Sequence, residues 1–312
     1  MQGGLTIGSR GSPLALWQAE AVKHALCDAH AGLTADGVRI EVIRTSGDRI
    51  QDRLLREAGG KGLFTKEIEE ALLDGRIDCA VHSAKDMPTE LPRGLTLAAF
   101  LPREDPRDAL IAADAASVAE LPPGARVGTA SLRRQAQLLR LRPDLEIVPL
   151  RGNVGTRIEK IRRGEAEATL MALAGLKRLG LAAEASALLD PEIMLPAPAQ
   201  GAVCVEIRSD DRRMAELLSA IADQQAAIAA TAERAFLAAL EGSCRTPIAA
   251  LARLDRNTLY LEGRLLSPDG RTCFAARREG AADQAASLGR EMGLALRAQA
   301  GEDFFQAILA AS

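Results

Sequence analysis

The sequence has few aromatic residues and almost no net charge. Among 312 residues there are one Trp, one Tyr and six Phe, and 39 basic side chains face 42 acidic ones, so the formal net charge is −3. Proteins that bind nucleic acid non-specifically need a basic face, and proteins that stack bases need aromatic side chains. We therefore expect no nucleic-acid partner.

Long apolar runs and clustered cysteines are also missing. No stretch approaches the roughly 20 apolar residues of a membrane-spanning helix. The start of the chain lacks the basic segment and apolar segment of a secretory signal. The cysteines form neither a CxxC pair nor a Cys/His cluster, so we expect no disulfide and no metal site. The cysteines are Cys27, Cys79, Cys204, Cys244 and Cys273. Together these absences predict a cytoplasmic protein.

Two series of short apolar strands, each alternating with amphipathic helices, follow one another along the chain. The first covers residues 5–81 and the second covers residues 126–173. Such alternation is typical of largely parallel sheets covered by helices. We expect two α/β lobes that face each other across a cleft, with strand ends and helix starts lining it.

The remaining sequence predicts a hinge and a third domain. A proline-rich run at residues 195–201 is typical of a hinge and precedes a strand over 202–208. An Ala-rich helix over 225–241 and three strands joined by hairpin turns then predict a small α+β domain with a three-stranded antiparallel sheet. The expected domains are residues 1–101 with 202–219 (first lobe), 107–195 (second lobe) and 224–312 (C-terminal domain).

Five arginines fall at predicted strand ends or helix starts of the two lobes. They are Arg10, Arg133, Arg134, Arg151 and Arg157. A guanidinium group binds carboxylate or phosphate through paired hydrogen bonds, and a helix N-terminus adds N–H donors. The hydroxyls of Thr129 and Ser131 lie at the same kind of place. A small polyanionic ligand is therefore indicated. On placement alone, solvated surface charges or pairs with local acids explain these arginines equally well.

Asp86 and Cys244 are the candidates for chemistry. Asp86 follows a buried strand, where a carboxylate can stabilise a developing cation or move a proton. A helix cap or an ion pair with Lys85 explains its position as well. Cys244 lies in a Gly-Ser-Cys-Arg turn beside Arg245, which favours the nucleophilic thiolate. An ordinary turn cysteine fits that position too, and the other four cysteines are expected to be inert core residues.

Seven motifs, in one order along the chain, give the sequence a close resemblance to the porphobilinogen deaminase (hydroxymethylbilane synthase) family. These motifs occupy residues 9–15, 59–64, 81–86, 103–109, 127–134, 150–157 and 240–244. The resemblance implies two lobes like those of periplasmic binding proteins plus a third domain. It also implies a dipyrromethane cofactor held by a thioether to Cys244, without metal. Four porphobilinogens would be condensed head to tail with loss of ammonia, and hydrolysis would release hydroxymethylbilane.

The resemblance also assigns residues to roles. Asp86 matches the catalytic aspartate, which would stabilise cationic azafulvene intermediates. Positions that contact the cofactor match Ser83, Lys85, Thr129, Ser131, Arg133, Arg134 and Arg157, besides Cys244. Positions that contact the substrate match Arg10, Ser12, Arg151 and Lys61, the last in a loop that covers the site. Glu57 departs from the pattern, since many relatives have a lysine there.

A non-catalytic, two-lobed module that binds a carboxylate ligand is the alternative function. It would explain the lobes and the arginines, but not a third domain that carries Cys244. We expect an enzyme that acts as a monomer on the small molecule porphobilinogen.

Overall fold

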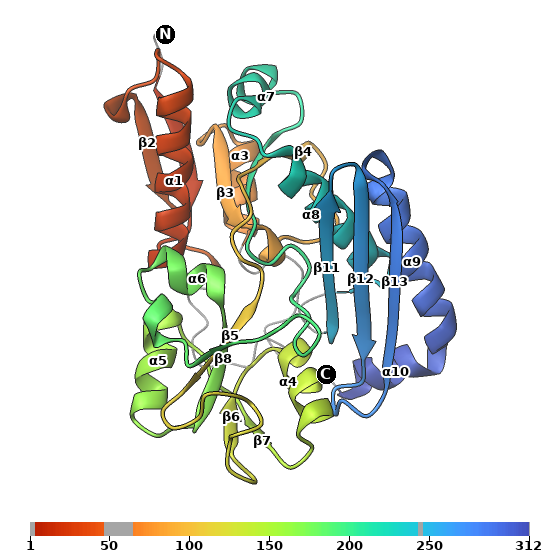
Figure 1. Cartoon of the computed structure of the whole chain (residues 1–312). Helices are drawn as coiled ribbons and strands as arrows, with labels where there is room; N and C mark the ends of the chain where they lie inside the picture. The colour runs from red at the N-terminus through yellow and green to blue at the C-terminus, as the bar shows by residue number, and fades with distance from the viewer. Residues whose placement is uncertain (1–3, 47–64, 243–245, 312) are drawn as a thin grey trace. The chain divides into compact units, whose positions relative to one another are not determined.

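The computed structural model describes residues 4–46, 65–242 and 246–311, and the chain divides into two compact units. The first unit comprises Met1–Glu104 with Ala202–Ala227, and the second comprises Asp105–Gly201 with Ile228–Ser312. Figure 1 labels the helices and strands of both. In the described part of the chain, no helix is long and apolar enough to cross a membrane.

The first unit is built on a five-stranded sheet of order β2-β1-β3-β10-β4. Its first three strands are parallel, whereas β10 runs antiparallel to both of its neighbours. Helices α1 and α7 pack on one face of the sheet and α3 packs on the other. The strands are β1 (Leu5–Ser9), β2 (Val38–Val42), β3 (Cys79–Ser83), β4 (Leu95–Phe100) and β10 (Val203–Arg208). The helices are α1 (Pro13–Ala29), α3 (Lys66–Leu73) and α7 (Arg212–Ser219), with short 3₁₀ turns η1 (Ala35–Gly37) and η2 (Ala84–Asp86).

Helix α1 begins where the sequence chemistry predicts. Ser12 caps the helix, since its hydroxyl accepts a hydrogen bond from the backbone N–H of Ala15 at 3.3 Å. Pro13 occupies the first helical position, where its missing N–H costs nothing. The turn between β1 and α1 is thereby fixed by local interactions, and with it the placement of Arg10.

The second unit contains a sheet with the same plan as the first. Its order is β7-β6-β8-β5-β9, and β5 runs antiparallel to β8 and β9 in the position that β10 occupies in the first sheet. The strands are β5 (Asp108–Ala112), β6 (Arg126–Gly128), β7 (Glu146–Val148), β8 (Ala168–Ala172) and β9 (Ala187–Leu188). The helices are α4 (Leu132–Leu141), α5 (Val154–Arg162) and α6 (Leu173–Arg178), followed by η3 (Ala182–Glu184). Two similar α/β lobes are thus confirmed, although the sequence analysis missed β4, β5 and β9.

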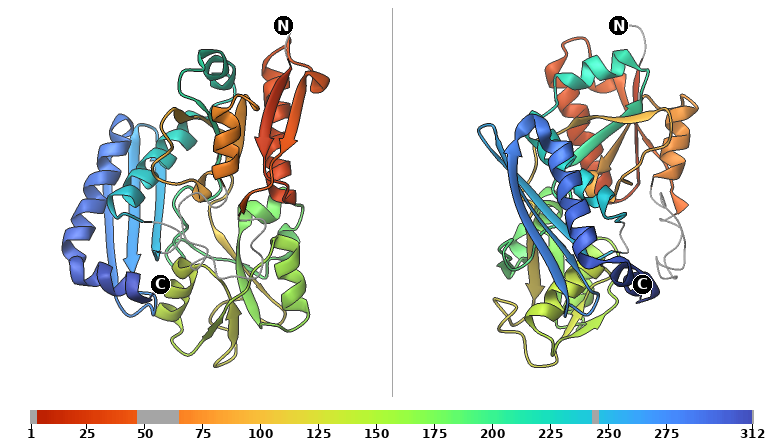
Figure 2. Two further views of the ribbon diagram at one scale, coloured as in Figure 1. Left: turned by 180° about the vertical axis from the view of Figure 1, so that it is seen from behind. Right: turned by 90° about the vertical axis from the view of Figure 1, so that its right-hand side faces the viewer.

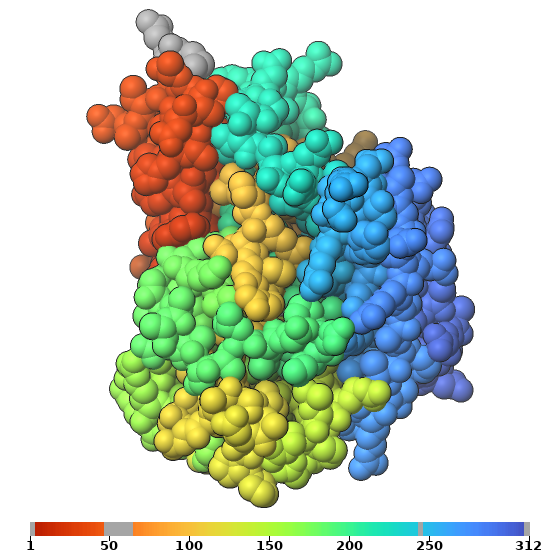
Figure 3. Space-filling view, in the orientation of Figure 1, coloured from red at the N-terminus to blue at the C-terminus, as the bar shows by residue number. Residues whose placement is uncertain are grey.

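The second unit also contains a three-stranded antiparallel sheet of order β11-β12-β13, as predicted. Side chains from this sheet and from α8, α9 and α10 form one core. Figure 2 shows α9 running along the sheet, and Figure 3 shows the surface of this C-terminal segment in blue. The strands are β11 (Ile248–Asp255), β12 (Thr258–Leu266) and β13 (Cys273–Ala281). The helices are α8 (Gln224–Ala239), α9 (Ala285–Ala300) and α10 (Glu302–Ala311), with η4 (Ala282–Gln284) before α9.

The cysteines correct one expectation. Cys79 and Cys204 are buried as predicted, and burial raises the pKa of the Cys79 thiol far above its usual range. Cys27 and Cys273, however, are only half-buried, so the expectation that they are core residues is wrong. Cys27 packs at the edge of the first unit's core, whereas on β13 it is Phe274 and Ala276 that pack against the core, not Cys273.

Candidate active site

In the first unit, the predicted site residues gather at one edge of the sheet. Arg10 and Ser12 follow β1, and Ser83 ends β3, which is the parallel neighbour of β1. Lys85 and Asp86 lie in η2 directly after β3. Because parallel strands end at the same edge of a sheet, the local folding of two separate segments places these five residues at that edge.

Asp86 is exposed at this edge. No hydrogen bond or ion pair joins its side chain to another residue within the described ranges. The structure therefore supports neither a helix cap nor an ion pair with Lys85 as the role of this carboxylate. An unengaged carboxylate at a strand end is available to accept hydrogen bonds from a bound molecule.

Ser83 is held by a residue that the sequence analysis missed. The amide Nε2 of Gln18 donates to the Ser83 hydroxyl at 2.9 Å, and that hydroxyl lies 3.3 Å from Gln18 Oε1. Gln18 is on α1 and is buried. A polar residue in the apolar stripe of a predicted helix was the available signal. The contact fixes the direction of the Ser83 hydroxyl at the edge that carries Asp86.

In the second unit, Thr129 and Ser131 form the start of α4. The Ser131 hydroxyl accepts from the backbone N–H of Arg134 at 3.5 Å and so caps the helix. The Ser131 N–H in turn donates to the Thr129 hydroxyl at 3.1 Å. Both hydroxyls therefore shape the helix N-terminus, whose N–H groups favour negative charge.

Arg133 and Arg134, on the first turn of α4, are buried around a carboxylate. Their side chains are 5% and 8% exposed, and that of Asp108 on β5 is fully buried. Asp108 lies 2.7 Å from Arg133 Nη1 and 2.7 Å from Arg134 Nη2, and Gln200 Nε2 donates to it at 3.1 Å. The two guanidinium groups hold the pKa of Asp108 well below its usual range, although burial opposes them. For these two residues, solvated surface charge is the wrong explanation and pairing with a local acid is correct.

Arg157, on α5, is a third cation near this pair. It is half-buried and has no hydrogen-bond or ion-pair partner among the described residues. Burial and the nearby charge of Arg134 lower its pKa to about 10, although Asp108 opposes both. A buried cation without a counter-ion is costly, so this position favours an anion.

The arginine cluster, as we call Arg133, Arg134, Arg157 and Asp108, holds three positive charges and one negative charge. Its net charge of about +2 in a poorly hydrated place suits a ligand with more than one carboxylate. Arg151, half-buried in the loop before α5, lies in the same segment of the chain. The structure thus brings together Arg133, Arg134 and Arg157, three of the four arginines that the sequence predicted for the second lobe. It adds Asp108, which lies in the motif at residues 103–109 but was assigned no role, and Gln200, which lies outside the seven motifs.

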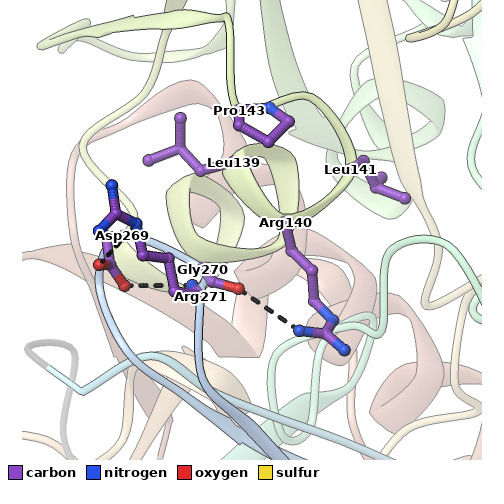
Figure 4. Close-up of a pocket in the computed structure, with 7 residues that line it drawn as sticks. All are labelled: Leu139, Arg140, Leu141, Pro143, Asp269, Gly270 and Arg271. Carbon is purple, nitrogen blue, oxygen red and sulfur yellow. Dashed lines mark hydrogen bonds and ion pairs between the residues drawn. The ribbon is translucent and has the colours of Figure 1, made fainter.

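A separate pocket of about 650 Å³ lies at the opposite end of α4 from the arginine cluster. Figure 4 shows its lining, in which Arg140 Nη1 donates to the Gly270 carbonyl at 3.5 Å. Arg271 pairs with Asp269 there, but the Arg271 side chain is 89% exposed. None of the predicted site residues lines this pocket. Lys61, Glu57 and Cys244 lie outside the described residues.

Comparison with known families decides which ligand this arrangement serves. Residues 5–216 match the family model described as porphobilinogen deaminase, dipyromethane cofactor binding domain, and residues 227–298 match the C-terminal domain of the same family. The chain belongs to the porphobilinogen deaminase family. The first match makes it an enzyme of tetrapyrrole biosynthesis, a transferase, with a dipyrromethane cofactor. The non-catalytic alternative is therefore wrong.

Porphobilinogen deaminases from several bacteria resemble the chain over nearly its whole length. The protein from Paracoccus denitrificans (strain Pd 1222) is 54% identical over 304 residues, which cover 97% of each chain. That from Nitrobacter winogradskyi is 55% identical over 300 residues, which cover 96% of this chain and 95% of the relative.

Solved structures with weaker likeness include two binding proteins. The methionine-binding protein MetQ is 14% identical, with a TM-score of 0.45, over 70% of this chain and 89% of that one. A periplasmic substrate-binding protein of an ABC transporter from Coxiella burnetii is 17% identical, with a TM-score of 0.42, over 70% and 91% of the two chains.

The residues present fit the cofactor that porphobilinogen deaminases carry. A dipyrromethane built from two porphobilinogen units bears acetate and propionate groups on both rings, so it is strongly anionic. The half-buried guanidinium group of Arg157 lacks a counter-ion among the described residues, and the arginine cluster as a whole has a net positive charge. Carboxylates are the complementary groups for such a site.

Proposed function

We propose that this protein condenses four porphobilinogens head to tail and releases hydroxymethylbilane. The proposal includes a cytoplasmic location, a monomeric state and no nucleic-acid or membrane partner. It also includes the three domains expected above: residues 1–101 with 202–219, 107–195 and 224–312. The observation that carries the proposal is the arginine cluster with its half-buried, uncompensated Arg157, in a chain of this family.

The cofactor, which Cys244 would hold through its sulfur, would supply the free pyrrole carbon to which the first porphobilinogen is joined, and each later unit would be joined to the ring added before it. In each round the substrate's aminomethyl group leaves as ammonia, and a carbon–carbon bond forms at that methylene. The ring carbon that formed this bond then loses its proton. Positive charge spreads over a pyrrole nitrogen while this happens. Asp86 accepts hydrogen bonds from pyrrole N–H groups and stabilises that charge, because its carboxylate is exposed at the sheet edge and unengaged.

The remaining site residues orient carboxylates. Arg157 binds one directly, and Arg134 contributes the donors that Asp108 leaves unused. Arg133 lies deepest, where its charge and its ion pair with Asp108 set the field of the cluster. We assign cofactor binding to Ser83, Lys85, Thr129, Ser131, Arg133, Arg134 and Arg157. We assign substrate binding to Arg10, Ser12, Arg151 and Lys61, and we assign no role to Glu57.

Intact mass spectrometry tests the attachment of the cofactor. The purified protein should exceed its sequence mass by two porphobilinogens less two ammonias, and Cys244→Ser should lack this adduct. The four other cysteines are the internal control, because the same adduct on Cys244→Ser would move the attachment elsewhere. An unmodified mass in fully active protein would refute the covalent cofactor.

The charge of Asp86 is tested by Asp86→Asn, which keeps the shape of the side chain. Loss of one charge-stabilising group typically lowers kcat by about 10²–10³-fold. The matched control is Asp74→Asn at the C-terminal end of α3, where the aspartate is 66% exposed. Turnover by Asp86→Asn within a few-fold of that of Asp74→Asn would rule out the electrostatic role.

A further inference from the structure

A buried glutamine joins the arginine cluster to two other parts of the second unit. Gln137 lies on α4 one turn after Arg133 and is 2% exposed. Its Oε1 accepts from the backbone N–H of Leu195 at 2.9 Å, and its Nε2 donates to the Leu195 carbonyl at 3.1 Å. One side-chain amide therefore satisfies both polar groups of one backbone residue, as a neighbouring strand would.

The Leu195 carbonyl also accepts a hydrogen bond from the arginine cluster. Arg133 Nη1 donates to it at 2.8 Å and lies 2.7 Å from Asp108. The carbonyl thus accepts from both Gln137 and Arg133, and it helps to fix the direction of the Arg133 guanidinium. A displacement of this carbonyl would move Arg133, whose buried charge has few other partners to hold it.

Leu195 is in turn held by the C-terminal sheet. Its side chain is fully buried against Ala249 and Leu251 of β11, and the next residue, Pro196, accepts a hydrogen bond from Ala250 at 3.0 Å. Arg264 of β12 also reaches α4, since its Nη1 donates to Gln137 Oε1 at 3.3 Å. Gln137 is therefore the residue where α4, the proline-rich segment and the C-terminal sheet meet.

We propose that Gln137 is a positioning residue for assembly of the cofactor: it holds the Leu195 carbonyl where that carbonyl orients Arg133. The inference rests on the proposed function, in which Arg133 serves the cofactor. The reason a glutamine is needed is chemical. A side-chain amide donates through its nitrogen and accepts through its oxygen, whereas neither an apolar residue nor a carboxylate satisfies the N–H and the C=O of Leu195 together.

Gln137→Leu is the test, and Gln135→Leu is its matched control. Gln135 lies on the same helix, and its Nε2 donates to the Pro268 carbonyl of the C-terminal domain at 3.2 Å, but it does not contact Leu195. Both variants lose a hydrogen bond to the same domain and are expected to have a lowered Tm. Only Gln137→Leu removes the hydrogen bonds to the N–H and C=O of Leu195.

The measured quantity is the rate at which apoprotein gains the cofactor mass on incubation with porphobilinogen, well below the Tm of each variant. Small misplacements of a binding group cost roughly 10–10²-fold. We therefore expect Gln137→Leu to load at least tenfold more slowly than the control, whereas a purely structural role would lower only the Tm. Gln137→Glu, which keeps the oxygen that accepts from Leu195, is expected to load at an intermediate rate and serves if Gln137→Leu does not fold.

Wild-type loading rates in the folded Gln137 variants would overturn the inference and leave the proposed function intact. If the wild-type protein itself gains no cofactor mass, the proposed function fails instead. The two failures are therefore distinguishable in one experiment.

Discussion

Replacing Asp108 by Asn removes the only negative charge of the arginine cluster while preserving its shape. Asp108 is fully buried and lies between two guanidinium groups that are themselves 5% and 8% exposed. Removing one partner of a buried ion pair costs about 3–5 kcal/mol, because the other charges stay buried without compensation. We expect Asp108→Asn to lower the free energy of unfolding by this amount at pH 7.

Asp105→Asn is the control for this substitution. Asp105 lies three residues earlier and pairs with Arg107, which is 38% exposed, at 2.6 Å. Because Arg107 stays in contact with solvent and Asp105 is not fully buried, we expect this pair to contribute less than the buried cluster, roughly 1 kcal/mol. Urea unfolding followed by circular dichroism compares the two variants with the wild-type protein. Equal losses below 1 kcal/mol in both variants would refute our account of the buried cluster.

The loss of stability in Asp108→Asn should depend on pH, and the pKa of Asp108 determines the direction. The native pKa of Asp108 is depressed, so its stabilising contribution is complete above the unfolded pKa of about 3.9 and is lost as the pH falls toward the native pKa. The stability difference between wild type and Asp108→Asn should therefore shrink by about 1 kcal/mol between pH 5 and pH 3. A difference that stays constant over this range would mean that the carboxyl does not titrate as the ion pairs require.

Two further predictions concern titratable groups. Burial and Arg134 lower the pKa of Arg157, and in the apoprotein the same environment should lower the pKa of a lysine below its ordinary value of about 10.4. The rate at which Arg157→Lys apoprotein gains the cofactor mass should therefore fall more steeply at alkaline pH than the wild-type rate, and parallel pH profiles would contradict this. Burial, helped by repulsion from Glu206, raises the pKa of Glu69, so native protein holds that proton more tightly than unfolded protein and loses stability as the pH rises above about 4.3. In urea unfolding, the stability of Glu69→Gln relative to the wild-type protein should increase as the pH rises above about 4.3. Glu70→Gln is the control, because the Glu70 side chain is 55% exposed, and its relative stability should not change. Parallel pH profiles for the two variants would refute the assignment.

Features fixed by local chemistry were predictable from the sequence. Ser12 and Pro13 set the start of α1, and the turn before Gly270 joins β12 to β13 as hairpin chemistry predicts. In both cases the deciding interactions lie within a few residues of one another. The sequence therefore carries the whole signal, and no distant contact has to be known.

Strands whose neighbours lie far along the chain were harder to predict. β5 begins with Asp108, a charged residue that an apolar pattern does not place in a core, yet it is buried because two arginines neutralise it. β10 was expected as a strand, but its antiparallel direction follows from the second crossing of the chain between lobes. Neither fact can be inferred from periodicity alone.

The candidate site likewise combines residues that could be predicted from the sequence with contacts that could not. The arginines could be predicted because helix starts and strand ends are visible in the sequence. Their partner Asp108 lies 26 residues before Arg134, and Gln137 meets Leu195 across 58 residues. Such pairings depend on sheet order, which the sequence motifs do not state. The motifs therefore located the charged residues, and the structure shows what holds them.

The position of β10 has a consequence for how the protein is made. This strand lies between β3 and β4 in the first sheet, yet it is synthesised more than 100 residues after both. The second sheet needs only residues from 108 to 188, all of which emerge earlier than β10. Proteins generally fold from the N-terminus during synthesis. The sheet of the first lobe, however, cannot be completed until β10 has been synthesised, because β10 separates β3 from β4. The second lobe can close before it.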